Sequence, residues 1–116
     1  RKDIPNLLSA IDILTAFSNP TYAKLSMSPT KIGEAFACGI PVISNEGIGD
    51  VKDIINTIQG GLVLKDLSDE SLKEASHKIK SLKEIKPRFI RERSRELLCL
   101  ERASRLYRNV YTRLNQ

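Results

Sequence analysis

The feature that most constrains the fold of this chain is the alternation of short apolar runs with segments of helix length. The runs IDILTAF (11–17), IPVIS (40–44) and LVLK (62–65) are rich in Ile, Leu and Val and are too short for helices, so they predict three strands, the first two of them buried. The segments 28–39 and 51–59 separate them. Parallel strands need crossover connections of this length, whereas antiparallel strands can be joined by tight turns. The pattern therefore predicts an α/β fold with a parallel sheet of about three strands, flanked by helices.

Residues that start and stop helices mark the ends of these segments. Ser28 is a candidate N-cap with Pro29 at the first helical position, and Gly39 is a candidate stop. A short helix is also expected over 3–10, with Leu7 and Leu8 turned inward.

From residue 68 onward the chain is predicted to be helical, with a tail made of successive helices. Apolar residues recur at helical spacing in two of these segments, which predicts one apolar face on each. In segment 69–83 they are Leu72, Ala75, Ile79 and Leu82. In the last helix, from about residue 100, they are Ala103, Leu106, Tyr107, Val110, Tyr111 and Leu114.

The net charge of +5 is concentrated in the C-terminal helices. Residues 1–77 carry 7 Lys and Arg against 10 Asp and Glu, a net charge of −3, and residues 78–116 carry 12 against 4, a net charge of +8. Most often such a tail is a solvated helix face, but it can also contact an anionic membrane or a partner domain. Nucleic acid is not an expected partner, because aromatic residues make up only 5% of the chain.

The chain offers few residues for metal or thiol chemistry. Cys38 and Cys99 lack a CxxC partner or a His at ligand spacing, so we interpret both as buried free thiols in a reducing, cytoplasmic setting. The only histidine, His77, is predicted to lie on the surface. We expect no metal and no cofactor. No apolar run approaches the roughly 20 residues of a membrane-spanning helix.

Two loops follow the first two predicted strands, where open parallel sheets bind ligands. The first leads into Ser28, Thr30 and Lys31, where free N–H groups and the helix dipole would face an anion. One helical turn further, Glu34 is an acid among small apolar residues. These residues predict a phosphate-binding floor with a carboxylate for sugar hydroxyls.

The second loop, 45–50, follows strand 40–44 and also leads into a helix. Its Glu46, Gly47 and Asp50 are candidate contacts for ligand hydroxyls, although acids in turns most often serve to form the turn.

The segment SPTKIGEAFACGIPVISNEGIGDVKDII resembles the donor-binding segment of GT-B fold, family 4-type retaining glycosyltransferases, and EAFACGIPVIS is its most specific part. DIPNLLSAIDILTAFSNP, GGLVL and LLCLERASRLYRNVYTRL are similar to the flanking parts of that family, with Leu98-Cys99 where Phe-Ser is usual. The resemblance covers nearly the whole chain. It implies that residues 1–116 form an incomplete, Rossmann-like C-terminal nucleotide-sugar-binding domain, without the N-terminal acceptor domain and the first strands.

The resemblance also implies the order of the sheet. The strands near 12–17, 40–44 and 61–65 are expected to be parallel neighbours in that order. Strand 12–17 would then expose one edge, so we expect the fragment to dimerise or to be marginally stable.

For activity, the resemblance implies transfer of a hexosyl group from a nucleoside diphosphate sugar in carbohydrate biosynthesis, with the fragment alone inactive. Glu34 would bind the ribose of the donor, and the amides of Ser28, Thr30 and Lys31 would meet its diphosphate. The family carries a further acid eight residues before this glutamate, where this chain has Ser26. The catalytic residues and the acceptor are not assigned.

Two alternatives remain open at this stage. The chain can be a nucleotide-sugar-binding module without transferase activity, such as a GT-B-like epimerase domain, and Ser26 keeps this alternative open. It can also be an interaction domain that uses its basic C-terminal helices. The full enzyme can also contact the inner face of a membrane.

Overall fold

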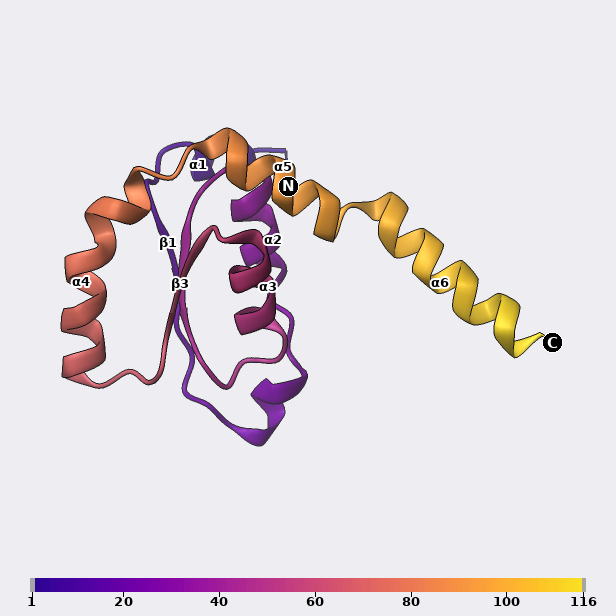
Figure 1. The fold of residues 1–116 in the computed structure, drawn as a ribbon, viewed down its shortest axis with the longest axis horizontal. Coiled ribbons are helices and arrows are strands. Elements are labelled where there is room, and N and C mark those ends of the chain that lie inside the picture. The colour runs from indigo at the N-terminus through magenta and orange to yellow at the C-terminus, as the bar shows by residue number, and fades with distance from the viewer. Residues whose placement is uncertain (1, 116) are drawn as a thin grey trace.

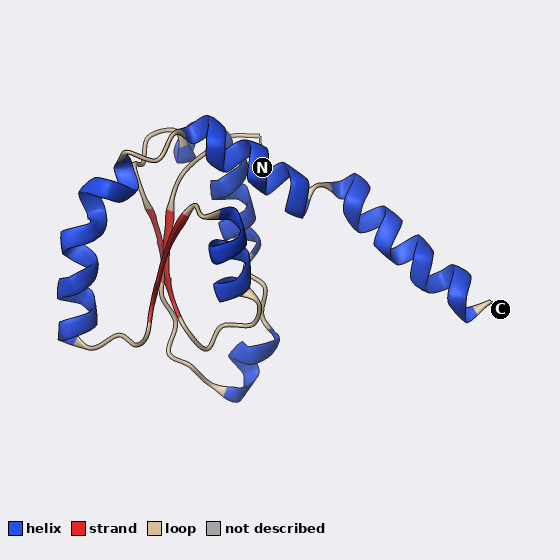
Figure 2. Ribbon diagram, in the orientation of Figure 1, coloured by secondary structure: helices blue, strands red, loops and turns tan. Residues whose placement is uncertain are grey.

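The computed structural model describes residues 2–115 and has an α/β architecture with a helical C-terminal tail (Figure 2). The strands are β1 (Leu14–Ala16), β2 (Val42–Asn45) and β3 (Gly61–Leu64). The helices are α1 (Ile4–Leu8), the 3₁₀ helix η1 (Tyr22–Ser26), α2 (Thr30–Ala37), α3 (Val51–Ile58), α4 (Asp69–Lys83), α5 (Pro87–Leu98) and α6 (Leu100–Leu114). The predicted fold class is therefore confirmed.

The sheet has the predicted order β1-β2-β3, and both pairs of strands are parallel. Thr15 pairs with Ile43, which pairs with Leu62 on the other side. Helices α2 and α3 provide the two crossover connections and lie on one side of the sheet, whereas α4 lies on the other (Figure 1).

Strand β1 is shorter and less buried than predicted from the run 11–17. It covers Leu14–Ala16, and Ile11 and Phe17 at the ends of the run are 38% and 43% exposed. The prediction of a fully buried strand was wrong because β1 has a neighbour on one side only. The predicted exposed edge is present, and dimerisation through it stays a prediction.

The sheet separates two apolar clusters, because successive residues of a strand point to opposite faces. Val42 belongs to the larger cluster, beneath α2, α3 and α5, and Ile43 to the smaller one, beneath α4. The fully buried members of the larger cluster include Phe36, Ile55, Ile58 and Ile90. Of the two leucines predicted to face inward, Leu8 packs against this cluster, whereas Leu7 is 70% exposed.

Helix α2 begins at Thr30 with Pro29 at the N-cap position, so the prediction of Ser28 as N-cap was wrong by one residue. Its predicted stop at Gly39 is confirmed, since this residue has φ +78°. A Cβ atom there would lie 2.7 Å from the carbonyl oxygen of Pro87, so both the backbone conformation and the approach of α5 require glycine.

The arginines of α5 attach this helix to the two crossover helices. Arg91 Nη1 lies 3.4 Å from the Cys38 carbonyl oxygen after α2, and Arg93 Nη2 donates to the Thr57 carbonyl oxygen in the last turn of α3. Cations are favoured at these helix ends because the last carbonyl groups carry partial negative charge. Some of the basic residues of the tail therefore make contacts within the fold.

Helix α6 extends away from the body beyond a break at Cys99 (Figure 1). None of its residues is buried. Among the helices of residues 2–115, none combines the length and the apolar character that crossing a membrane requires.

Candidate functional site

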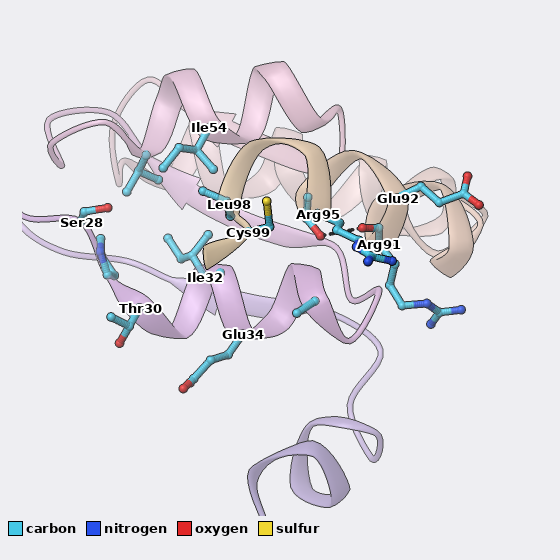
Figure 3. Close-up of a pocket in the computed structure, with 15 residues that line it drawn as sticks. Ser28, Thr30, Ile32, Glu34, Ile54, Arg91, Glu92, Arg95, Leu98 and Cys99 are labelled. Atoms are coloured by element: carbon cyan, nitrogen blue, oxygen red, sulfur yellow. Dashed lines mark hydrogen bonds between the residues drawn. The ribbon is translucent and has the colours of Figure 1, made fainter. Parts of the chain in front are cut away.

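An open groove of about 740 Å³ lies between α2, the start of α3 and α5 (Figure 3). Its apolar floor includes Ile32, Ile54 and Leu98, one from each helix. The polar residues at its margin come from the segment leading into α2, from α2 itself and from α5. They are Ser28, Thr30, Glu34, Arg91, Glu92, Ser94 and Arg95.

The sequence pattern of α2 decides which of its side chains reach this margin. Ile32, Ala35 and Phe36 form the buried face and anchor the helix to the core. Thr30 and Glu34 stand one turn apart on the same face of the helix. Figure 3 shows both side chains on the side of α2 turned away from Ile32 and α5.

Glu34 is half-buried and lies at two hollows at once. It lines the groove and also a smaller hollow of about 290 Å³, which Ile4, Pro5 and Leu8 of α1 help to form. Its carboxylate has no hydrogen bond or ion pair with any other residue of the described part, 2–115. A carboxylate without a protein partner is available for ligand hydroxyl groups.

The N–H groups at the N-terminus of α2 are free to donate hydrogen bonds to a ligand. No side chain of residues 2–115 caps it, and no acidic residue stands in its first turn. The amides of Thr30 and Lys31 come before the first intrahelical hydrogen bonds, so they point out of the helix end with the positive end of its dipole. Ser28 and Thr30 line the groove, whereas the Lys31 side chain is exposed and does not.

Two arginines of α5 at this groove were missed by the sequence analysis. Arg91 and Arg95 stand one turn apart and line the groove together with Leu98 of the next turn. The sequence pattern predicts only that these arginines belong to the basic C-terminal tail. The helical spacing of these three residues was the signal that could have placed them on one face.

The loop after β2 makes its contacts within the fold. Glu46 pairs with Lys52, Nζ to Oε1 at 2.6 Å, and this hydrogen bond raises the pKa of the exposed Lys52 ammonium. Asp50 occupies the N-cap position of α3 without a side-chain hydrogen bond. The structure does not bring Glu46, Gly47 or Asp50 to the groove.

The same loop supports the segment that leads into α2. The Gly49 amide donates to the Lys24 carbonyl oxygen, and a Cβ atom at Gly49 would overlap the Met27 carbonyl oxygen. A Cβ atom at Gly47 would lie 2.7 Å from Cβ of Pro20. These close approaches hold the two loops at the carboxyl edge of the sheet against each other.

Asn45, at the end of β2, was not recognised as important from the sequence. It is 1% exposed, and its amide group accepts from the Ser18 N–H at 3.0 Å and donates to the Ser18 carbonyl oxygen at 2.8 Å. It therefore continues the pairing of β1 with β2 through a side chain. The sequence signal that could have identified Asn45 is a polar residue directly after a buried apolar strand.

The remaining candidate residues lie apart from the groove or at its end. Ser26, in η1, is exposed, and its hydroxyl donates to the Ala23 carbonyl oxygen. Cys38 and Cys99 are free thiols as predicted, but both are half-buried rather than buried, because each stands at a helix end. His77 is exposed, as predicted. Within residues 2–115, no three His, Cys, Asp or Glu side chains gather where they could hold a metal ion.

Comparison with known families gives one result. A sequence profile described as "Glycosyl transferases group 1" matches residues 1–96, which include the sheet, α2, α3 and most of α5. The match ends before Leu98 and α6. A search among curated proteins and a search among solved structures found no match.

Proposed function

The chain belongs to the group 1 glycosyl transferases, and from this premise we propose that its groove binds the nucleoside diphosphate part of a sugar donor. The observation that carries the proposal is the position of Glu34. Its carboxylate has no partner among residues 2–115, and the residue stands one turn from the uncapped N-terminus of α2.

In this proposal the diphosphate meets the first turn of α2. The free amides of this turn and the helix dipole favour an anion there. Ser28 and Thr30, at the margin of the groove, add hydroxyl groups. Arg91 and Arg95 line the same groove, where their cationic side chains favour an anion.

Glu34 would accept hydrogen bonds from the ribose hydroxyls. Hydrogen bonds to an ionised acceptor are stronger than those between neutral groups, and partial burial strengthens them further. The small residues Gly33 and Ala37, next to Glu34 in the groove, leave space for a sugar ring.

The reaction itself would be transfer of a hexosyl group to an acceptor with retention of configuration, in a cytoplasmic setting and without a metal. The acceptor site would lie on an N-terminal domain, so the chain alone would bind the donor without turning it over.

A second function, donor binding without transfer as in a GT-B-like epimerase, is favoured by one observation. Ser26 stands where the family has a further acid, and its hydroxyl is engaged with the Ala23 carbonyl oxygen of its own helix.

Titration calorimetry of the chain with uridine and guanosine diphosphates tests the site. Glu34→Gln removes the charge and keeps the shape, so it should weaken binding by about 1.5–3 kcal/mol, roughly ten- to a hundredfold. His77→Ala, at an exposed position of α4, is the matched control and should leave binding unchanged. Equal affinities of the wild-type chain and a folded Glu34→Gln variant would refute the assignment of Glu34.

A further inference from the structure

The loop that leads into the proposed phosphate site is supported by a second loop. Residues 17–29 connect β1 to α2, and residues 46–50 connect β2 to α3. Both loops leave the carboxyl edge of the sheet from neighbouring strands (Figure 1). Loop 17–29 contains Ser28, at the margin of the groove, so the path of this loop decides where the Ser28 hydroxyl lies and how the chain enters α2.

Apolar packing contributes little to the conformation of loop 17–29. None of its residues is buried, and none belongs to either apolar cluster of the core. Its large apolar side chains, Phe17, Tyr22, Leu25 and Met27, are between 40% and 92% exposed. Contacts with loop 46–50 and with the end of β2 are therefore needed to define its path.

Asn45 makes the most buried of these contacts. It is 1% exposed, its Oδ1 accepts from the Ser18 N–H at 3.0 Å, and its Nδ2 donates to the Ser18 carbonyl oxygen at 2.8 Å. Nδ2 also donates to the Glu46 carbonyl oxygen at 2.9 Å. Rotation of this buried carboxamide would leave a donor and an acceptor without partners, so one orientation is strongly favoured. Asn45 therefore fixes the start of both loops.

Two glycines of loop 46–50 complete the support. A Cβ atom at Gly47 would lie 2.7 Å from Cβ of Pro20, and one at Gly49 would overlap the Met27 carbonyl oxygen. The Gly49 amide also donates to the Lys24 carbonyl oxygen at 2.9 Å. Both glycines have positive φ, +84° and +36°, which residues with a Cβ atom rarely adopt. Together with the asparagine, they contact loop 17–29 in order from its start almost to its end.

Ser44, the residue before the asparagine, has a different partner. It is 0% exposed, and its hydroxyl donates to the Ala16 carbonyl oxygen at 2.8 Å. Ala16 is the last residue of β1 and is paired with Ser44 in the sheet. Two adjacent buried polar side chains thus make the same kind of bond, one to the strand and the other to the loop that follows it.

We propose that Asn45 is a positioning residue of the donor site, which holds loop 17–29 in the conformation that presents Ser28 and the start of α2 to the diphosphate. This inference rests on the proposed function of the groove. Asn45 lies outside the groove and would touch no ligand. It would act through entropy, because a loop that is already ordered loses less conformational freedom when the ligand binds.

Titration calorimetry with uridine and guanosine diphosphates, combined with amide hydrogen exchange followed by NMR, tests the proposal on the full chain. Asn45→Ala should weaken binding of the preferred nucleotide about five- to tenfold. It should also accelerate exchange of the Ser18 and Gly49 amides roughly tenfold or more, because both bonds depend on the path of the loop. The matched control, Ser44→Ala, also removes a buried hydrogen bond and should lower the urea midpoint. It should change nucleotide binding and exchange at these two amides less than about twofold.

Gly47→Ala is a second variant, which leaves Asn45 in place and displaces Pro20 from the other side of the contact. It should weaken nucleotide binding about threefold, and it decides the matter if Asn45→Ala does not fold. Wild-type affinity in a folded Asn45→Ala or Gly47→Ala variant, alongside weakened binding by Glu34→Gln, would overturn the proposal and leave the donor site standing. Equal losses for Asn45→Ala and Ser44→Ala would overturn it too, since affinity would then follow stability. Absence of nucleotide binding by the unmodified chain would refute the proposed function, and the positioning role with it.

Discussion

Helices α4 and α6 have the same length, 15 residues, and the same spacing of apolar residues, yet their surroundings are opposite. Helix α4 buries Ala75 and Leu82 against Ile43 and Leu64 of the sheet. Helix α6 buries none of its residues. Helical periodicity therefore predicts that an apolar face exists, and it does not predict what covers that face.

The difference follows from where each helix leaves the body. A short connection joins α4 to β3, so the helix returns along the open face of the sheet (Figure 1). Helix α6 follows α5, whose buried Ile90 already belongs to the layer of α2 and α3. Beyond Cys99 α6 continues outward and buries none of its residues (Figure 1).

The largest expected effect comes from truncating one leucine in each helix. Leu82→Ala should lower the free energy of unfolding by about 2–4 kcal/mol, because it leaves a cavity between α4 and the sheet. Leu106→Ala, at a 53% exposed position of α6, should change it by less than about 0.5 kcal/mol. Urea denaturation measures both values. A loss above about 1 kcal/mol for Leu106→Ala would mean that α6 packs on the body.

The caps of the two helices give a smaller contrast. The Ser68 hydroxyl accepts from the Ser71 amide at the start of α4, whereas the Cys99 thiol, a weak acceptor, receives the Arg102 amide at the start of α6. Ser68→Ala should cost about 1 kcal/mol of global stability. Cys99→Ser should instead increase the helicity of α6 and leave the midpoint of urea unfolding unchanged. A shift of that midpoint would couple α6 to the core.

Removal of α6 should have a smaller effect still. A chain that ends at Cys99 should unfold with a free energy within about 0.5 kcal/mol of the full chain, because α6 contributes no buried residue. Thermal and urea denaturation of the two chains provide the measurement. A clearly less stable truncated chain would show that the exposed helix supports the body.

The smallest expected effect is on the pKa values of the acids near the start of α4 and α6. Hydrogen bonds from the side chains of Ser68 and Ser71 and from the Ser68 amide lower the pKa of Asp66 from 3.8 to about 2. A lowered pKa in the folded state means that this contribution to stability is complete above the ordinary value and is lost as pH falls toward 2. The pKa of Glu101 at the start of α6 is also lowered, mainly by its own backbone amide.

Titration of the carboxyl groups, followed by carbon-13 NMR, tests these pKa shifts. Asp66 should titrate near 2, and Ser71→Ala should move its pKa toward 3.8. The pKa of Glu101 should be unaffected by Ser71→Ala, which makes it the internal control. A pKa near 3.8 for Asp66 in the unmodified chain would show that the serines do not hold its carboxylate.

Much of the fold was predictable because it depends on local chemistry. Pro87 begins α5, Ser68 caps α4, and Gly39 ends α2, each for a reason contained within a few residues of the chain. The parallel order of the sheet was implied by the resemblance, and its crossover connections followed from the lengths between the strands. The candidate site was predictable in part, since Ser28, Thr30 and Glu34 lie on consecutive turns around the start of α2.

What the sequence by itself determined is therefore the order of the helices and strands other than η1, most of their boundaries to within two residues, and the family to which the chain belongs. The tertiary structure alone decided that Arg91 and Arg95 reach the groove, that Glu46 turns to Lys52, and that Asn45 holds Ser18. It also decided that α4 buries Ala75 and Leu82, whereas α6 buries no residue. The physical reason is that capping and periodicity depend on residues within one or two helical turns. These contacts instead join residues that are far apart in the sequence, so they depend on how the helices and strands pack.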